Sequence, residues 1–186
     1  MIDPARDLER RLAAGDGPMR WSSVTTRRLG AVVVAYIDQC PFFVSLGAPG
    51  EVHAWAQGLA IPPLVWDPHA PRALRAALRA VVDRGQRYAG PVGLVHETPF
   101  QQAVLIATRA IPCGETRTYG EMAAAIGRPR AARAVGSALA ANPLPLLIPC
   151  HRVVGAGRRL GFYSDGGPDM KRRLLAYEGA DVASFR

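Results

Sequence analysis

The sequence has few of the features that mark secreted, membrane-spanning or metal-binding proteins. No apolar run approaches the about 20 residues that a transmembrane helix needs. The first residues, MIDPARDLERR, mix acidic and basic side chains and contain no apolar stretch like that of a secretory signal, so we expect a cytoplasmic protein. The three cysteines, Cys40, Cys113 and Cys150, are far apart, and no Cys-x-x-Cys pair occurs. The sequence therefore predicts neither a disulfide framework nor a metal site, and it contains no glycine-rich nucleotide-binding loop.

Lysine is almost absent, and the basic residues are unevenly distributed. Of 23 basic residues only Lys171 is a lysine, a bias that a GC-rich genome can produce without any function. Residues 1–97 carry 11 basic and 9 acidic side chains, whereas residues 98–186 carry 12 basic and 6 acidic ones. Most of the net charge of +8 thus lies in the second half, which indicates a polyanionic partner for that half.

The first half of the chain predicts a small domain of strands and one helix. The stretch AVVVAYIDQCPFFVSLG reads as two β-rich runs broken at Gln39-Cys40-Pro41, typical of a hairpin or a bulged strand pair. A helix is expected to begin at Pro71 and end near Gly85. Its expected apolar stripe is Leu74, Ala77, Leu78, Val81 and Val82. The Gly- and Pro-rich stretch AGPVGLVHETP looks like a linker, so we expect an N-terminal α/β domain of residues 1–95 and a second domain of residues 96–186.

The second half predicts several short helices. PFQQAVLIATRAI reads as a helix, PCGETRTYG as a turn followed by an N-cap signal, and EMAAAIG as a helix that ends at Gly127. Pro129 is expected to begin a further helix that ends at Asn142-Pro143. Two short helices joined by a tight turn suggest a helix-turn-helix, whose second helix would be the recognition helix. The small residues of that helix fit either tight packing on its neighbours or entry into a nucleic-acid groove, and the basic bias favours the groove.

The stretch IPCHRV places a thiol, an imidazole and a guanidinium in succession after an apolar run. A lone cysteine in such a run is usually a small buried hydrophobe. His151, however, offers a base in a suitable pKa range, and Arg152 cannot be buried without a partner, which favours a reactive site at Cys150. Because neighbouring side chains point apart in an extended chain, we expect proton transfer from Cys150 to His151 to pass through a water molecule.

Four segments together resemble a known family. The segments are GETRTYG, RAVGSALAANP, PCHRV and KRRLLAYEG. Their order, and approximately their spacing, resemble those in the active-site domain of the O6-alkylguanine-DNA alkyltransferases, also called methylated-DNA–protein-cysteine methyltransferases. The resemblance covers about residues 98–180, and residues 1–95 match only loosely. It implies an α/β fold: a small ribonuclease-H-like domain of a sheet and a helix, followed by a helical, winged-helix-like DNA-binding and active-site domain with a helix-turn-helix.

The activity that the resemblance implies is DNA repair by direct alkyl transfer. An alkyl group would pass irreversibly from O6 of guanine, with O4 of thymine as a further candidate, to Cys150 in a single turnover, without cofactor or metal. The implied partner is double-stranded DNA containing O6-alkylguanine, bound by a monomer, with cooperative binding as a further expectation and no membrane partner. A nucleoid-associated location follows if the source is bacterial or archaeal. Two alternatives are a helix-turn-helix protein that flags lesions without transfer and a cysteine hydrolase; relatives that do not repair lack the acceptor cysteine, which this chain has.

The resemblance also implies roles for individual residues. Cys150 matches the alkyl acceptor, His151 the residue that takes the thiol proton through water, and Glu178 the carboxylate that orients this histidine. Asn142 matches the residue that links the recognition helix to the active-site loop. Tyr119 matches a tyrosine that contacts the phosphate and protonates the leaving guanine. With such a relay, we expect the Cys150 thiolate to be more available at neutral pH than that of a free cysteine.

Further residues are implied in DNA binding and in the pocket for the alkylated base. Arg133 matches the arginine that enters the base stack when the nucleotide flips out. The other residues implied in DNA binding are Arg130, Ala132, Gly136 and again Tyr119, and those implied in the pocket are Tyr163, Ser164 and Pro145. The loop GFYSDGGPDM carries one residue more than the family pattern, which we place at Asp165.

Overall fold

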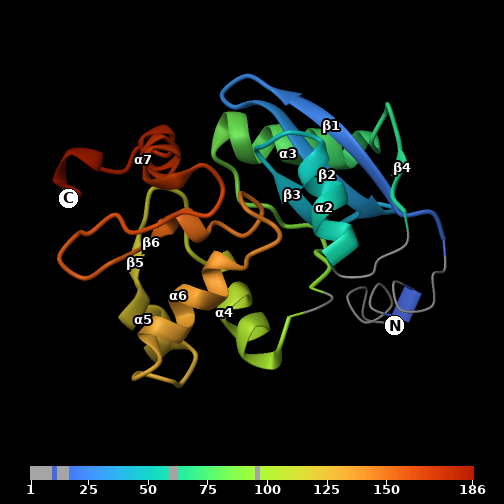
Figure 1. The fold of residues 1–186 in the computed structure, drawn as a ribbon. Coiled ribbons are helices and arrows are strands. Elements are labelled where there is room, and N and C mark those ends of the chain that lie inside the picture. Colours follow the sequence, from blue (N-terminus) through green and yellow to red (C-terminus); the bar gives the residue numbers. More distant parts are fainter. Residues whose placement is uncertain (1–9, 12–16, 59–62, 95–96) are drawn as a thin grey trace. The chain divides into compact units, whose positions relative to one another are not determined.

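The computed structural model describes residues 10–11, 17–58, 63–94 and 97–186 (Figure 1). These residues form a mixed α/β structure with two sheets and six α-helices in the described part. They divide into two compact units: the first contains the described residues up to Arg84 and residues 88–94, and the second contains residues 85–87 and 97–186. The predicted boundary between residues 95 and 96 falls outside the described residues. A search of the described helices finds none with the length and apolarity needed to cross a membrane.

The first unit is built on a four-stranded sheet with the strand order β3-β2-β1-β4. The strands are β1 (Arg20–Thr26), β2 (Gly30–Ile37), β3 (Cys40–Ser45) and β4 (Val65–Trp66). β2 pairs antiparallel with both β1 and β3, and β4 pairs parallel with β1. The predicted strand pair is confirmed and has both expected features, a hairpin turn and a bulge between Ala35 and Tyr36. The turn comes slightly earlier than predicted because Asp38 takes the left-handed backbone conformation (φ 54°), so Cys40 already begins β3.

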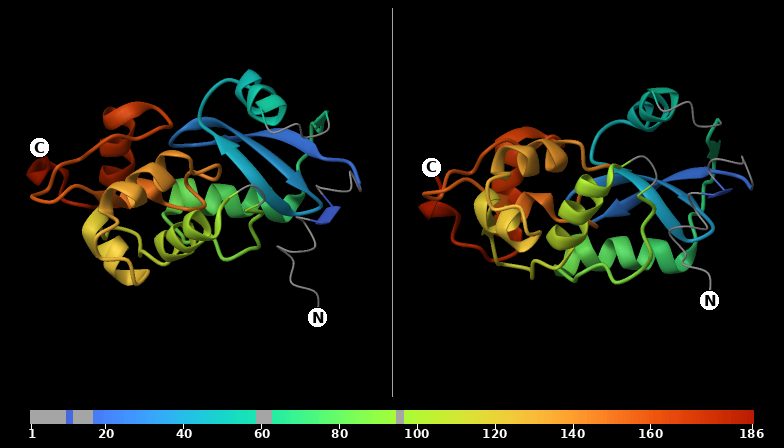
Figure 2. Two further views of the ribbon diagram at one scale, coloured as in Figure 1. Left: turned by 60° about the horizontal axis from the view of Figure 1, so that its bottom comes forward. Right: turned by 90° about the horizontal axis from the view of Figure 1, so that it is seen from below.

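Helices α2 (Gly50–Gly58) and α3 (Arg72–Arg84) lie on opposite faces of this sheet, as the right-hand view of Figure 2 shows. Successive strand side chains point to opposite faces, so the sheet has a face for each helix: α2 packs against β2 and β3, and α3 packs against β1. Residues of β2 and β3 form one buried cluster with residues of α2: Val33, Ala35, Ile37, Phe42, Phe43, Val52 and Ala56. The α3 helix lies where Pro71 and Gly85 predicted. Its buried residues are Leu74, Leu78, Ala80 and Val82, and the other two residues of the expected stripe, Ala77 and Val81, are half-buried.

The second unit is mainly helical (Figure 1). Its α-helices are α4 (Pro99–Arg109), α5 (Tyr119–Ala125), α6 (Ala132–Ala140) and α7 (Gly167–Tyr177). Two short parallel strands, β5 (Arg117–Thr118) and β6 (Val153–Val154), and two 3-10 turns, η1 (Cys150–Arg152) and η2 (Val182–Ser184), complete it. Helices α4, α5 and α6 pack against one another. All residues from 142 to 154 are buried, so the stretch around Cys150 forms part of the core of this unit.

Local sequence signals explain how two of these helices begin, and a third begins later than predicted. Thr98 and Thr118 are the N-caps of α4 and α5, and each forms a capping box with the residue three positions later. Helix α6 begins at Ala132 and not at Pro129, because the residues from 128 to 131 form a turn closed by the bond from Ala131 N to Arg128 O (2.8 Å). Arg130 therefore lies in the exposed turn between α5 and α6 and not on the expected helix.

Candidate active site

A tight turn presents the Cys150 thiol at the surface of the core. The backbone N–H of Cys150 donates to Ile148 O (2.8 Å), and that of Arg152 donates to Pro149 O (2.9 Å), which closes the turn η1. Cys150 is 6% exposed and lines a cavity, so its sulfur is both held by the core and accessible from one side. Because Cys150 and His151 belong to a turn and not to an extended chain, their side chains do not have to point to opposite faces.

Asn142 connects the end of α6 to this turn. Its side-chain amide donates to Ile148 O (3.0 Å) and to the Cys150 Sγ (3.1 Å), and its Oδ1 accepts from Leu144 N (3.1 Å). Asn142 is 7% exposed, so these bonds are made in the core, where an unpaired amide would be costly. The amide thus fixes the position of the sulfur relative to α6.

Behind the thiol, Glu178 accepts hydrogen bonds from two buried side chains. His151 Nε2 lies 2.8 Å from Glu178 Oε1, and Arg152 donates through Nε and Nη2 to the two carboxylate oxygens (2.8 and 2.7 Å). Arg152 also donates through Nη1 to Ile111 O (2.6 Å). The partner that Arg152 needs for its burial is therefore the same carboxylate that holds His151.

The protonation states in this cluster follow from burial and charge. Burial by itself would raise the pKa of Glu178, but the hydrogen bonds from His151 and Arg152 outweigh it and lower that pKa to about 2. Glu178 is thus a carboxylate that accepts from the N–H at His151 Nε2, which leaves Nδ1 as the acceptor nitrogen. Burial lowers the pKa of His151 despite Glu178, so the imidazole is neutral at pH 7. Nδ1 is buried and has no hydrogen-bond partner among the described residues, so its lone pair is available to a proton.

The expectation of a readily available thiolate is wrong for the resting protein. Burial raises the pKa of Cys150 to about 11, and the hydrogen bond from Asn142 and the charge of Lys171 only partly offset it. The apolar run before Cys150 causes the burial, and the sequence neighbours of the thiol do not reveal how complete it is. At neutral pH the sulfur therefore carries its proton, and a reaction at this sulfur needs a base at the moment of attack.

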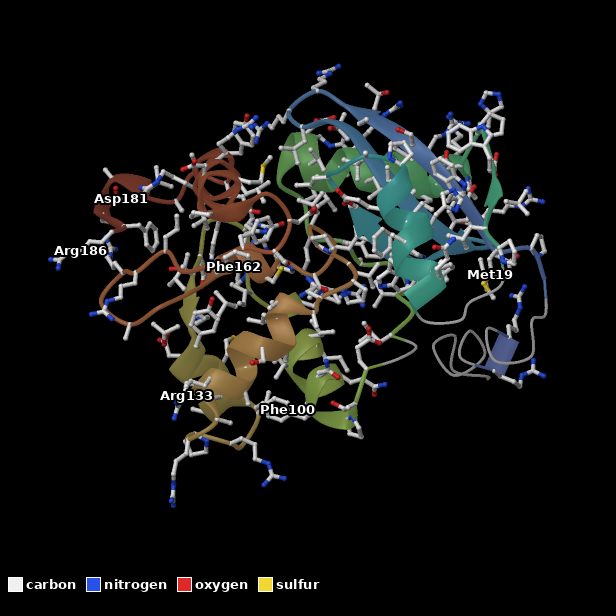
Figure 3. The ribbon with its side chains drawn as sticks, viewed as in Figure 1. Met19, Phe100, Arg133, Phe162, Asp181 and Arg186 are labelled. Carbon is white, nitrogen blue, oxygen red and sulfur yellow. The ribbon has the colours of Figure 1, made fainter. Side chains whose placement is uncertain are left out.

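The thiol lines a cavity of about 760 Å³ that is bounded by residues of the second unit. Its lining residues are Thr118, Tyr119, Gly120, Ala132, Arg133, Gly136, Ser137, Leu139, Ala140, Cys150, Ala156, Phe162, Tyr163 and Ser164. Arg133 is exposed near the start of α6, and Phe162 lies on the loop that leads to α7 (Figure 3). Burial raises the pKa of both Tyr119 and Tyr163, so both phenols keep their protons and can donate hydrogen bonds.

The structure brings seven of the residues implied by the resemblance to this cavity: Tyr119, Ala132, Arg133, Gly136, Cys150, Tyr163 and Ser164. Asn142, His151 and Glu178 contact Cys150 or its turn and do not line the cavity. Arg130 is exposed in the turn before α6, and Pro145 is buried; neither lines the cavity, and their implied roles stay predictions. Within the described ranges, no three His, Cys, Asp or Glu side chains are grouped so that they could hold a metal ion.

Sequence reasoning missed Lys171, the only lysine of the chain. It is 1% exposed, and its Nζ donates to Val153 O (2.7 Å) and lies 5.9 Å from the centre of the Tyr119 ring. Burial lowers its pKa to about 8, and its charge in turn lowers the pKa of Cys150. Lys171 precedes Leu174 and Leu175 by three and four residues, the spacing of one helix face, and that spacing is the signal that predicts burial.

Comparison with known proteins shows which family the second half of the chain is similar to. The family model described as "6-O-methylguanine DNA methyltransferase, DNA binding domain" matches residues 99–180. A methylated-DNA–protein-cysteine methyltransferase of Salmonella typhimurium is 54% identical over 82 residues, which are 44% of this chain and 47% of that protein. The protein of the same name from Mus musculus is 44% identical over 95 residues, 48% of this chain and 45% of that protein. In these matches the chain spans about half the length of the curated relatives.

Solved structures extend the likeness over most of the chain. The crystal structure of Mycobacterium tuberculosis O6-methylguanine methyltransferase has a TM-score of 0.71 and 32% identity, covering 86% of this chain and 92% of that one. The structure of OGT from the same organism in complex with DNA has a TM-score of 0.72 and 31% identity, covering 89% and 98%. Since this likeness spans both units, and the family model runs from α4 through α7, the chain belongs to the O6-methylguanine-DNA methyltransferase family.

Proposed function

We propose that the protein repairs DNA by moving an alkyl group from O6 of guanine directly and irreversibly to the Sγ of Cys150. One observation carries this proposal: the Cys150 thiol lines an open cavity, accepts a hydrogen bond from Asn142 and adjoins His151, which is hydrogen-bonded to the largely buried carboxylate of Glu178. A solved structure that covers 86% of the chain and a curated relative that matches 44% of it are both named for this activity, which supports the same conclusion. One protein molecule would repair one base, because nothing in the proposed chemistry regenerates the thiol.

Helix α6 is the element that would meet the DNA. The alkylated atom is inaccessible inside a duplex, so the nucleotide must flip out, at a cost of a few kcal/mol. Arg133, exposed at the rim of the cavity, would occupy the vacated space in the base stack. Arg130, in the preceding turn, and the small residues Ala132 and Gly136 would allow close approach to the phosphate backbone. The helix-turn-helix of α5 and α6, a winged-helix-like second domain and a ribonuclease-H-like first domain belong to this proposal.

The transfer step is a displacement at the alkyl carbon. As the sulfur forms a bond to carbon, the bond from carbon to O6 breaks and its electron pair goes to the guanine. The thiol proton leaves through a water molecule for Nδ1 of His151, which no described residue contacts by a hydrogen bond, while Glu178 stabilises the imidazolium that forms. This order suits a thiol whose pKa is about 11, because deprotonation then accompanies attack and does not precede it.

The negative charge that develops on the leaving guanine needs a donor. Tyr119 lines the same cavity and keeps its proton because burial raises its pKa. We infer that it acts by hydrogen bonding to the base, since a phenol of raised pKa is a weaker acid than a free one. Such a donor, held in place before the reaction, stabilises charge that appears only in the transition state.

A protein that flags lesions without repairing them is the second candidate function. Cys150 argues against it, because an accessible thiol with a base behind it is not needed for recognition alone. A cysteine hydrolase remains a weaker reading, since no oxyanion-binding element is evident near the turn η1 in the described part of the chain.

The test is substitution of Cys150. We expect Cys150→Ala and Cys150→Ser to abolish alkyl transfer from O6-methylguanine duplexes and to leave duplex binding largely intact, because the docking surface is unchanged. Cys113→Ser is the matched control, since this exposed cysteine does not line the cavity and its loss should leave transfer unchanged. Transfer by the Cys150→Ala protein would overturn the proposed mechanism.

A further inference from the structure

Phe162 is an exposed aromatic ring at the cavity that contains the reactive thiol. It is 71% exposed, whereas its neighbour Tyr163 is 3% exposed and Leu160 is 4% exposed. Of the large apolar side chains in the described part of the chain that are exposed, Phe162 is the most exposed and lines the cavity; Ile106, Val65 and Trp66 do not line it. An apolar ring left in water at a binding cavity is a ready contact for an apolar ligand group.

Two features constrain the backbone of the loop that carries this ring. Gly161 has φ 73°, a conformation that favours glycine, and a Cβ at that position would come within 3.2 Å of the Tyr119 hydroxyl. Tyr163, the residue after Phe162, is buried, and its hydroxyl has no hydrogen-bond partner among the described residues. The backbone carbonyl of Phe162 accepts a hydrogen bond of 3.4 Å from Lys171 Nζ. The loop thus leaves room for glycine only at position 161 and bonds to Lys171 through the Phe162 carbonyl, while the Phe162 side chain is exposed.

Helix α6 contributes several small side chains to the wall of the cavity. Ala132, Gly136 and Ala140 follow one another at intervals of four residues, lie on one face of α6, and all line the cavity. With this thin wall the cavity reaches about 760 Å³, within the range of about 300–1,000 Å³ that is typical of pockets for drug-sized ligands. Its size thus leaves room for a base with a substituent much larger than methyl.

We propose that Phe162 is a specificity-determining residue that favours large, aryl-bearing groups on O6 of guanine over a methyl group. The inference rests on the proposed transfer to Cys150, which fixes the first carbon of the substituent at the sulfur. A methyl group ends at that carbon, whereas a benzyl group carries a whole ring beyond it. Only the larger substituent has atoms that extend from the sulfur toward another wall of the cavity, where Phe162 is the exposed apolar group.

The test compares single-turnover rates of wild-type protein and Phe162→Ala on three substrates: an O6-methylguanine duplex, an O6-benzylguanine duplex and the free base O6-benzylguanine. Phe162→Ala should react about tenfold more slowly with both benzyl substrates, equivalent to about 1.4 kcal/mol, and within about twofold of wild type with the methyl duplex. Phe162→Tyr, which keeps the ring, should retain most of the benzyl rate. Ile106→Ala, which removes a 63% exposed apolar side chain outside the cavity, is the matched control and should change none of the rates.

Each other result overturns the inference in a recognisable way. Equal losses on methyl and benzyl substrates would make Phe162 a general positioning residue. A loss on both duplexes but not on the free base would mean that the ring contacts DNA and not the substituent. If wild-type protein alkylates Cys150 but the ratio of benzyl to methyl rates is unchanged in Phe162→Ala, the inference fails and the proposed function stands. If wild-type protein transfers neither group, the proposed function fails first. Thermal unfolding of each variant checks that an exposed substitution leaves the fold intact.

Discussion

Replacing Glu178 with glutamine tests the buried cluster behind the thiol most sharply. The substitution keeps the volume of the side chain and removes its charge. The carboxylate accepts three hydrogen bonds, one from His151 and two from Arg152. An amide has one acceptor oxygen, so at least one N–H of the guanidinium would face the new NH2 group. Arg152 is 2% exposed and would keep its bond to Ile111 O but lose its counter-charge.

The expected loss of stability can be bounded from the structure. Removing one partner of a buried ion pair typically costs about 3–5 kcal/mol, because the other charge stays buried without compensation. The pKa of Glu178, lowered from 4.5 to about 2, corresponds to about 3 kcal/mol of preferential stabilisation of the charged form. We therefore expect Glu178→Gln to lower the free energy of unfolding of the second unit by about 3 kcal/mol.

The assay must report on the second unit. All three tryptophans, Trp21, Trp55 and Trp66, lie in the first unit, so tryptophan fluorescence would miss the change. Hydrogen exchange followed by mass spectrometry, on peptides from η1 and α7 across a urea series, measures it directly. The matched control is Glu115→Gln, which breaks the exposed pair of Glu115 and Arg117 and should cost less than about 1 kcal/mol. A loss as small as that of the control would refute the reasoning about the buried pair.

The same variant separates the structural from the chemical use of the carboxylate. Without the charge, His151 is a weaker base, so single-turnover transfer by folded protein should slow at least about tenfold. If Glu178→Gln melts early but reacts at the wild-type rate while folded, the relay has no support and Glu178 is structural. The stabilisation that Glu178 provides depends on pH in a direction that its pKa determines. Because the folded pKa is lowered, the stabilisation is complete above about pH 4.5 and is lost as the pH falls toward about 2.

Three further predictions follow from the cavity and its charges. Arg133→Ala should slow transfer from duplex DNA more than from free O6-benzylguanine, because a free base needs no flipping; equal losses in single-turnover assays would assign Arg133 to folding or thiol activation. In pH–rate profiles, transfer should fall only as the pH drops through the lowered pKa of His151, whereas a tenfold rise per pH unit up to about 11 would indicate attack by a preformed thiolate. Lys171→Met should leave the stability at pH 7 unchanged or higher, because burial disfavours the charged lysine and lowers its pKa to about 8. The same substitution should slow transfer, because it removes a charge that lowers the pKa of Cys150. Unfolding and rate measurements check the two effects, and a large loss of stability would contradict the first.

Features set by neighbouring residues could be predicted from the sequence. The ends of α3 follow from Pro71 and Gly85, and the start of α5 follows from the Thr118 capping box. The predicted start of α6 at Pro129 was wrong, because a proline at this position is compatible with a first helical turn but equally with the turn that forms instead. Local propensity does not distinguish the two when the N-cap residue, here Ala131, makes no side-chain bond.

In the active site, too, the sequence predicted some features and missed others. The sequence marked Cys150 as unusual and required a partner for Arg152, but that partner, Glu178, is 26 residues away, and only the family resemblance pointed to it. The degree of burial was also not visible, which is why the thiol was expected to be ionised although its pKa is raised to about 11. Lys171 was overlooked because it begins the basic run KRR, typical of a solvated helix face, while the fold turns it into the core.

Intact-mass spectrometry, followed by peptide mapping, tests the central claim most directly. The protein is incubated with a duplex containing one O6-methylguanine and then analysed without any added cofactor. The proposed mechanism predicts that each chain gains one methyl group in place of one proton, that the group is on Cys150 and not on Cys40 or Cys113, and that the guanine is restored in equal amount. Restored guanine with an unmodified chain, or a methyl group on another residue, would contradict it.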